Sequence, residues 1–386
     1  MANVLYLCDW LPPDFGAVGQ YSVAFARRRA GLGDDVLLAG FSSTATSVEA
    51  VDDLAPGRLE IVRLRTRPID RGRFGRRMLW TAWANSRLLW SVRRRLALCD
   101  EVVFTGSPPL LLHWLGPLNL ALRKRLVYRI TDFHPECLMA EFDRPPWLLR
   151  MFYRLTLFWR RRVDRFEALG EDARRRLLEM GIPADRVTLQ RDEAPITIDP
   201  QATPLERPAE LAGKAILLYS GNFGLAHDHE TLIAGYERHH RQGSGRVALW
   251  INAIGAKADL VETRLRALGL PVHRSRPAPL EQLNSLLVTP DAHLITLRDA
   301  FVGYVLPSKV YACVASGREV LFIGDAASDV DLICRQAPSL AYQRVATGDA
   351  AGVAAALETI ASRSADAVGE SNALATIPGE AARGEA

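Results

Sequence analysis

The sequence predicts an α/β protein built from two doubly wound domains. The chain has 386 residues, enough for about two domains of ordinary size. In both halves short β-rich runs alternate with longer helical patterns, which is typical of βαβ units and parallel sheets. A proline-rich stretch separates the halves. We therefore expect a first domain over 1–193, a linker over 194–208, a second domain over 209–361 and a disordered tail over 362–386.

The expected strands are short runs rich in β-branched, aromatic and other apolar residues. In the first half they are 4–8, 35–39, 59–64, 101–105, 126–130, 165–169 and 187–189. In the second half they are 215–220, 247–251, 272–275, 293–297 and 320–323. The linker carries four prolines in fifteen residues, which excludes a helix or a central strand there. The tail is rich in Ala, Ser, Gly and Glu and has no aromatic residue, so it predicts disorder.

Composition narrows the class of protein. Apolar residues make up 48% of the chain and charged residues 24%, which excludes a disordered or fibrous protein. The five cysteines are scattered without Cys-x-x-Cys spacing, so neither a disulfide framework nor a zinc site is indicated. No uncharged apolar run has the length of a membrane span, and the start predicts a strand, not a signal peptide. We expect a protein of the reducing cytoplasm.

Positive charge is concentrated in the first half. Residues 1–200 contain 31 Lys and Arg against 24 Asp and Glu, whereas the remainder contains 17 against 20. Almost all of this positive charge is arginine, since the chain has only four lysines. The first half is therefore the candidate for contact with an anionic partner.

A glycine turn follows the first strand of each half. Gly16 and Gly19 stand at the start of an amphipathic helix, where backbone amides favour a phosphate. The turn lacks the G-x-G-x-x-G spacing, and no acid ends the second strand, so a nicotinamide cofactor is not indicated. Gly221, Asn222 and Phe223 form the second turn and can present amides to an anion. Turn formation alone is the alternative for both.

Lys309 is the strongest single candidate for a ligand-binding residue. It follows Pro307 and Ser308 at the expected start of a helix whose end suits Gly317. A lysine at a helix N-terminus is unfavourable against the dipole unless an anion is bound there. Lysines are scarce here, so Lys309 is interpreted as a phosphate ligand; a surface lysine is the alternative. Downstream of the second glycine turn, His227 suits a hydrogen bond to a phosphate or a sugar hydroxyl, or a loop contact.

These motifs resemble those of nucleotide-sugar glycosyltransferases of family 4, in the capsule, exopolysaccharide and O-antigen branch. The similarity rests on YSGNFGLAHD at 219–228 and PSKVYACVASGR at 307–318, with PPDFGAVG at 12–19 and TDFHPE at 131–136. It covers most of residues 3–345. The resemblance implies a GT-B architecture of two Rossmann-like domains facing a central cleft, with the donor nucleotide on the second. It also implies retention of anomeric configuration without a metal ion.

Carried onto this sequence, the resemblance assigns the donor site to a set of turn residues: Gly16, Gly19, Gly221, Asn222, Phe223, His227, Gly303, Pro307 and Ser308. Lys309 would neutralise the diphosphate. Two departures stand out, because many relatives carry glutamates where this chain has Tyr304 and Ala312. The usual Gly-Pro after the lysine helix is replaced by Arg318 and Glu319.

Asp132 and His134 follow an expected strand, at the edge where doubly wound sheets bind ligands. They are candidates for orienting the donor sugar or the acceptor, and would be the bases to test in an inverting enzyme, with Asp14 a further candidate. Capping of the following helix is the alternative for both.

A basic aromatic stretch over 71–95 contains Arg76, Trp83 and Trp90, and a second lies over 147–162. Arginine with tryptophan suits the interface of an anionic membrane. The alternative is buried aromatics beside a solvated basic face, and no module for nucleic acid is present.

The sequence therefore predicts a glycosyltransferase that moves a sugar from a UDP- or GDP-sugar to a polyprenyl-diphosphate-linked oligosaccharide. It would work without a cofactor or metal, in the cytoplasm, peripherally at the inner face of the plasma membrane. A nucleotide-sugar epimerase or hydrolase on the same fold is one alternative. A non-catalytic scaffold subunit of a polysaccharide assembly is another.

Overall fold

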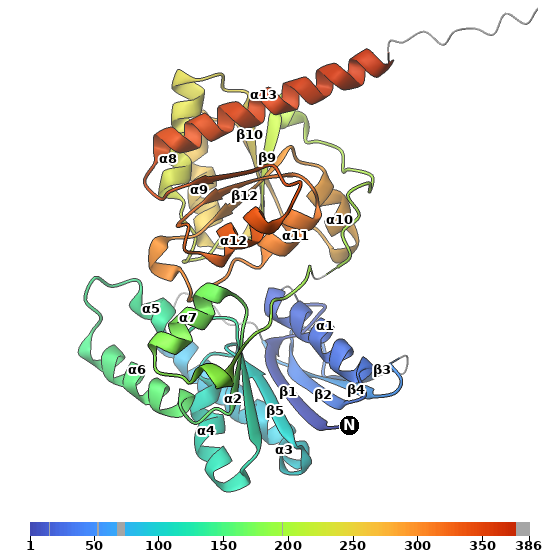
Figure 1. Ribbon diagram of the computed structural model, residues 1–386, viewed down its shortest axis with the longest axis vertical. Helices are drawn as coiled ribbons and strands as arrows, with labels where there is room; N and C mark the ends of the chain where they lie inside the picture. The colour runs from blue at the N-terminus through green and yellow to red at the C-terminus, as the bar shows by residue number, and fades with distance from the viewer. Residues whose placement is uncertain (15, 52–53, 68–73, 195, 376–386) are drawn as a thin grey trace, which may run out of the picture. The chain divides into compact units, whose positions relative to one another are not determined.

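The computed structural model describes the chain except for residues 15, 52–53, 68–73, 195 and 376–386. It divides into two compact units (Figure 1). Unit 1 comprises Met1–Pro195, Ala300–Ser308 and Ala327–Asp329, and unit 2 comprises Ile196–Asp299, Lys309–Ala326 and Val330–Ala386. Two short segments that the sequence analysis places in the second domain therefore pack in unit 1.

Unit 1 is built on an eight-stranded sheet in the order β3-β4-β2-β1-β5-β6-β7-β8. All neighbours are parallel except β3, which runs antiparallel to β4. The strands are β1 (Asn3–Trp10), β2 (Asp35–Ser42), β3 (Ser47–Val51), β4 (Arg58–Arg65), β5 (Glu101–Thr105), β6 (Arg125–Ile130), β7 (Arg165–Ala168) and β8 (Val187–Leu189). Seven of these match expected strands. β3 was missed because it is an edge strand with exposed residues and no apolar run.

Helices cover both faces of this sheet. They are α1 (Ala17–Gly31), α2 (Phe74–Ser91), α3 (Arg93–Leu98), α4 (Leu111–Leu122), α5 (Glu136–Met139), α6 (Trp147–Arg160) and α7 (Glu171–Glu179). Side chains alternate along β1, so that Tyr6 packs with Phe25 of α1 while Leu5 and Leu7 share a core with α2, α4 and α7. The strand order reverses at β1 and β5, and the carboxyl ends of strands at such a reversal are the usual binding position in this architecture.

Two buried arginines hold unit 1 together. Arg129 on β6 pairs with Glu167 on β7 at 3.0 Å and with Asp192. Arg160 at the end of α6 pairs with Glu136 and donates to the His134 carbonyl at 3.0 Å. Buried charges of this kind require their partners, because a lone charge in the interior is costly.

Unit 2 is a six-stranded parallel sheet in the order β11-β10-β9-β12-β13-β14. Its strands are β9 (Ala215–Asn222), β10 (Val247–Ile254), β11 (Val272–Ser275), β12 (Ala292–Thr296), β13 (Glu319–Ile323) and β14 (Tyr342–Val345). Its helices are α8 (Glu230–Gln242), α9 (Ala256–Ala267), α10 (Leu280–Val288), α11 (Lys309–Ala315), α12 (Asp329–Gln336) and α13 (Ala350–Ala375). Five strands match the sequence expectation; β14 was missed because its YQRV sequence has no continuous apolar run.

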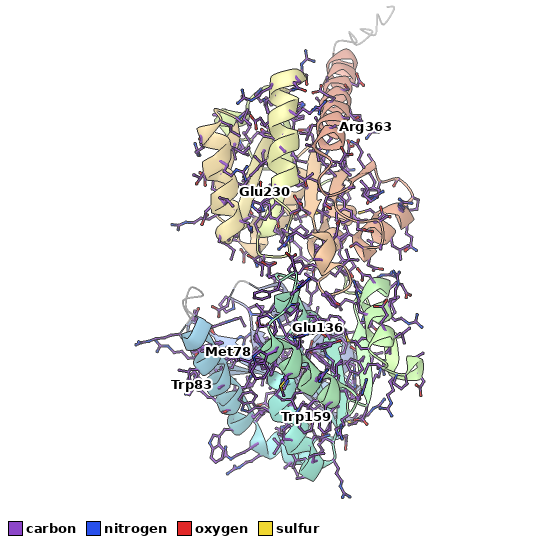
Figure 2. The ribbon with its side chains drawn as sticks, turned by 90° about the vertical axis from the view of Figure 1, so that its left-hand side faces the viewer. Met78, Trp83, Glu136, Trp159, Glu230 and Arg363 are labelled. Atoms are coloured by element: carbon purple, nitrogen blue, oxygen red, sulfur yellow. The ribbon has the colours of Figure 1, made fainter. Side chains whose placement is uncertain are left out.

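The expected tail over 362–386 is wrong for its first part, which continues helix α13 to Ala375. Alanine is the best helix former, so a composition without aromatics still extends a helix that is already nucleated. Arg363, labelled in Figure 2, pairs with Glu319 at 2.7 Å. Earlier in α13, Val353 packs so closely on α8 that a Cβ at Gly235 would lie 2.4 Å from it. Residues 376–386 of the expected tail lie outside the described residues.

The expected linker forms no helix or strand over 196–208, and the division between the units falls at its start. Residue 195 lies outside the described part of the chain.

Candidate functional site

Lys309 provides a buried amine at the start of α11. Its Nζ is inaccessible to solvent and has no hydrogen-bond partner among the described residues. The amine lies 3.2 Å from the centre of the Tyr219 ring, a cation–π contact. Burial lowers the pKa of Lys309 from 10.5 to about 7. A buried donor without an acceptor is rare in folded proteins and indicates a position where a ligand supplies the acceptor.

The glycine bend at the end of β9 meets this amine. Gly221 has φ +115°, a conformation that side-chain-bearing residues rarely adopt. A Cβ built there would stand 3.7 Å from Cε and 3.8 Å from Nζ of Lys309. Two segments far apart in the sequence thus come together in unit 2. The expected convergence of Lys309 with the glycine bend is present.

The residues after the bend serve mainly to shape it. Phe223 is fully buried, stacks on Tyr219 at 4.0 Å, and its amide donates to the Ile254 carbonyl at 2.7 Å. The expectation that the Phe223 amide serves an anion is therefore wrong, because strand pairing already uses it. The Tyr219 hydroxyl donates to the Asn222 carbonyl at 3.0 Å, and the Asn222 side chain is exposed.

His227 is neutral and its tautomer follows from its contact. Its Nδ1 lies 2.7 Å from the Thr296 carbonyl oxygen, which only accepts, so Nδ1 carries the proton. Burial and the nearby charge of Lys309 lower the pKa of His227 to about 3. The remaining nitrogen, Nε2, can then only accept a hydrogen bond. Of the two ligands expected for His227, this chemistry fits a hydroxyl and disfavours a phosphate oxygen.

Three donor-site residues that the sequence placed in the second domain pack in unit 1 instead. A Cβ at Gly303, which has φ +80°, would stand 2.8 Å from the Asp172 carbonyl oxygen, so packing and backbone conformation alone require glycine there. The Ser308 carbonyl accepts from the Tyr21 hydroxyl at 3.2 Å. Pro307 is buried in the same segment. The unit division thus falls between Ser308 and Lys309.

The two glycines of the first turn differ in their packing. A Cβ at Gly19 would stand 1.9 Å from the Trp10 carbonyl oxygen, so this glycine permits close packing of α1 on β1. Gly16 is the N-cap of α1 with extended backbone, and a Cβ there would approach nothing closer than 4.0 Å. Packing and backbone conformation therefore do not require glycine at position 16. The Asp14 carboxylate accepts from the Ser43 amide at 2.8 Å, which favours a structural role over catalysis.

A carboxylate cluster lies at the carboxyl ends of the central strands of unit 1. Burial and the neighbouring Asp9 raise the pKa of Asp132 to about 6. Asp9 accepts a hydrogen bond from the Ser107 hydroxyl at 2.6 Å. Asp132 lies two residues after the end of β6, in a setting suited to proton exchange near neutral pH. The sequence predicted Asp132 and His134 here but not Asp9, the second-to-last residue of β1, or Ser107, two residues after the end of β5; their position at the carboxyl ends of strands was the available signal.

His134 borders a small cavity of about 10 Å³, about the volume that one water requires. Its backbone carbonyl is bound by Arg160, as described above. His113 also lines the cavity and stacks on Phe152 at 4.7 Å. Its Nε2 lies 3.1 Å from the Thr156 hydroxyl.

The basic aromatic stretch divides into α2 and α3, with a break at Val92. Trp83 is 50% exposed and Trp90 is 69% exposed. Arginines lie over both rings, Arg87 at 5.2 Å and Arg93 at 4.4 Å. Arg76 belongs to α2, but its side chain lies outside the described part of the structure.

Among the described residues, no three His, Cys, Asp or Glu side chains are grouped so that they could hold a metal ion. None of the helices in this part of the chain combines the length and the apolar character that a membrane span requires.

Comparison with known proteins decides the fold. No family model matches the sequence. A solved structure from Anabaena, HepE in complex with UDP and glucose, superposes with a TM-score of 0.62 over 93% of this chain and 89% of its own, at 12% identity. The lipopolysaccharide glycosyltransferase WaaG superposes with a TM-score of 0.55 over 94% and 91%, at 14% identity. The fold is GT-B.

A sequence relative points the same way. The chain is 24% identical over 248 residues to a probable glycosyltransferase, WbjE, of Pseudomonas aeruginosa. The match spans 60% of this chain and 60% of that protein's length. The resemblance to glycosyltransferases noted in the sequence, and the two Rossmann-like domains that it implies, are thereby confirmed.

Proposed function

We propose that this GT-B protein is a glycosyltransferase that transfers a sugar from a UDP- or GDP-sugar to a lipid-linked oligosaccharide. The observation that carries the proposal is the amine of Lys309, which is buried against the Gly221 bend and has no hydrogen-bond partner in the part of the chain that the structure describes. A diphosphate placed there gives the amine an acceptor and restores its charge. Support for the donor class comes from HepE, solved with UDP and glucose, and from an E. coli trehalose-6-phosphate protein solved with UDP-2-fluoro glucose.

The transfer breaks the bond between the anomeric carbon and the diphosphate oxygen, whose electron pair stays on the leaving diphosphate. The acceptor hydroxyl oxygen forms the new bond to the anomeric carbon, and its proton goes to the leaving phosphate oxygen. In this scheme anomeric configuration is retained and neither metal nor cofactor takes part. The charged form of Lys309 stabilises the negative charge that develops on the diphosphate. The neutral His227 accepts a hydrogen bond from a hydroxyl of the donor sugar.

The acceptor class rests on the relatives and on the surface of unit 1. The neighbours include WaaG and the lipopolysaccharide outer core galactosyltransferase WaaB, both named for lipopolysaccharide chemistry. A polyprenyl-diphosphate-linked acceptor would place the protein in the cytoplasm, peripherally at the inner face of the plasma membrane. Asp132 and His134 in unit 1 are the groups that would orient the acceptor.

The donor site is tested by titrating UDP, GDP and their sugar nucleotides into the full chain and following the melting temperature. We expect a rise with one nucleoside diphosphate that Lys309→Met abolishes. Lys214→Met is the matched control, because Lys214 precedes β9 and its amine donates to the Gly245 carbonyl at 2.7 Å. No response to any nucleotide would refute the proposal.

A non-catalytic scaffold subunit is the second candidate, favoured by one observation. Where many relatives carry glutamates, Ala312 is buried in α11 and Tyr304 packs on Phe133 in unit 1 at 5.8 Å. A scaffold would bind its partners equally well after Lys309→Met, whereas a transferase would lose turnover.

A further inference from the structure

Helix α6 has three chemically different faces. Its sequence, WLLRMFYRLTLFWR, contains no acidic residue. One face is buried against the rest of unit 1 and includes Thr156 and Arg160. A helix held by one face alone ordinarily presents polar side chains on the others. The remaining surface of α6 does not follow that rule.

A stripe of large apolar side chains faces solvent along the whole of α6. Trp147 is 60% exposed, Leu148 64%, Met151 58%, Leu155 46% and Phe158 45%. At the helical period these five fall within a sector of about 100°, so they form one continuous strip. Apolar strips of this kind on a folded domain mark a surface that is covered in use.

An arginine stripe borders the apolar one. Arg150, Arg154 and Arg161 are exposed and fall within an adjacent sector of about 40°. None of the three has an acidic partner among the described residues. No acid that the structure describes therefore pairs with these arginines, and their charge stands beside the apolar strip along its length.

The neighbouring helices continue the same chemistry. Helix α4 packs tightly on α6, since a Cβ at Gly116 would lie 2.5 Å from the Trp159 ring, and it exposes Leu120. On its other side α4 is joined to α2 by a hydrogen bond of 3.0 Å from the Trp114 indole to the Ser86 hydroxyl. Neither α2 nor α4 contains an acidic residue. Figure 2 shows α2, with Met78 and Trp83 labelled, and α6, with Trp159 labelled, on the same side of unit 1.

We propose that this α2–α4–α6 face of unit 1 docks on an anionic lipid bilayer, with α6 lying in the plane of the interface. The apolar strip enters the boundary between headgroups and acyl chains, as amphipathic interfacial helices do. The arginines reach lipid phosphates, which their planar guanidinium groups bind bidentately. Unneutralised arginine beside an apolar strip, with no acid on three helices, complements an anionic lipid surface. The inference does not depend on the proposed transferase activity.

The test is sedimentation of the full chain with vesicles of phosphatidylcholine alone, or of phosphatidylcholine with 30 mol% phosphatidylglycerol. We expect binding to the anionic vesicles that weakens with salt, and little binding to the neutral ones. The double variant Leu148→Glu/Met151→Glu should bind at least tenfold more weakly. Arg150→Ala/Arg154→Ala should lose about fivefold per arginine, on anionic vesicles only.

Leu32→Glu is the matched control. Leu32 follows α1 on the opposite face of the sheet and is 77% exposed, so this change puts a negative charge at an exposed leucine outside the α2–α4–α6 face and should leave vesicle binding unchanged. Far-ultraviolet circular dichroism and UDP or GDP titration check that each variant is folded. A variant that loses vesicle binding but still binds the nucleotide supports the docking proposal. Such a result also shows that the donor site is unaffected.

Three results would overturn the proposal. The first is absence of wild-type binding to the anionic vesicles. The second is equal binding by wild type and Leu148→Glu/Met151→Glu. The third is a concentration-dependent dimer that forms with the wild type but not with this double variant, in which case a second copy of the chain covers the strip.

Discussion

Binding of a nucleoside diphosphate at Lys309 should take up a proton from solvent. In the free protein the pKa of Lys309 is about 7, lowered from 10.5 because its amine is buried, and no described residue offers it a hydrogen-bond acceptor. A diphosphate beside the amine supplies negative charge, which stabilises the ammonium and raises its pKa. Above pH 7 the protein is mostly neutral at Lys309 before binding and charged afterwards, so the proton must come from the buffer.

The size of the effect follows from that pKa. At pH 8 a group with a pKa of about 7 is roughly one-tenth protonated, so binding takes up about 0.9 proton where the bound pKa lies above 10. The apparent affinity then falls about 50-fold between pH 7 and pH 9, because the binding-competent charged form becomes scarce.

Stability changes in the opposite direction over the same range. The pKa of Lys309 is lower in the folded chain than in the unfolded one, so between about pH 7 and 10.5 the unfolded chain binds more protons. The free energy of unfolding therefore rises with pH there, by at most about 4 to 5 kcal/mol from this group.

Isothermal titration calorimetry measures the proton directly. UDP and GDP are titrated at pH 8 in two buffers of different ionisation enthalpy, and the difference in apparent enthalpy gives the number of protons taken up. Lys309→Met should bind at least tenfold more weakly at pH 7 and take up no proton. Lys214→Met should behave as wild type.

Two outcomes would refute this reasoning. Tight nucleotide binding at pH 8 without proton uptake would show that the Lys309 amine does not meet the phosphates. Wild-type affinity in Lys309→Met would show that the buried amine has only a structural role.

The remaining predictions concern packing and the donor sugar. Gly19→Ala should lower the free energy of unfolding by at least about 2 kcal/mol, because its Cβ would collide with a strand carbonyl. Gly16→Ala should change the free energy of unfolding by less than about 1 kcal/mol. Urea titration measures both values. Arg160→Met leaves a buried carboxylate unpaired and should cost about 3–5 kcal/mol, against about 0.5 for the exposed Arg162→Met. His227→Phe removes the nitrogen that accepts a hydrogen bond from the sugar hydroxyl, so initial-rate kinetics should show at least tenfold lower kcat/KM for the sugar nucleotide. An equal loss of affinity for the free nucleoside diphosphate would contradict this role.

Much of the fold was predictable because parallel strands buried on both faces are continuous apolar runs. β9 and β10 show this pattern and begin where it begins, but they run two and three residues beyond their expected ends. β3 and β14 carry no such run, since they are edge strands paired on one side only. The segment 300–308 packs in unit 1 through long-range contacts, among them an isolated bridge between Asp132 and Val305, which are too distant in sequence for any local pattern to indicate.

The candidate site also has features that the sequence predicts and features that it does not. The meeting of Lys309 with the Gly221 bend follows from topology, because both lie at strand-to-helix turns of one sheet. The Tyr219 ring under the amine and the protonated nitrogen of His227 depend on side-chain packing. No spacing in the sequence reveals them, nor the fact that Ile254 already occupies the Phe223 amide.

The departure at position 312 bears directly on the chemistry of Lys309. Ala312 lies three residues after Lys309 in α11, a spacing that places two side chains on the same face of a helix. A glutamate there, as the resemblance to family 4 leads one to expect, would stand within reach of the amine and hold it charged. With alanine at that position burial dominates and lowers the pKa of Lys309, and the neighbouring Cys313 thiol, whose own pKa burial raises to about 12, is neutral near pH 7. The residue change that removes an acid from the site is therefore the same change that makes its lysine depend on the ligand for its charge.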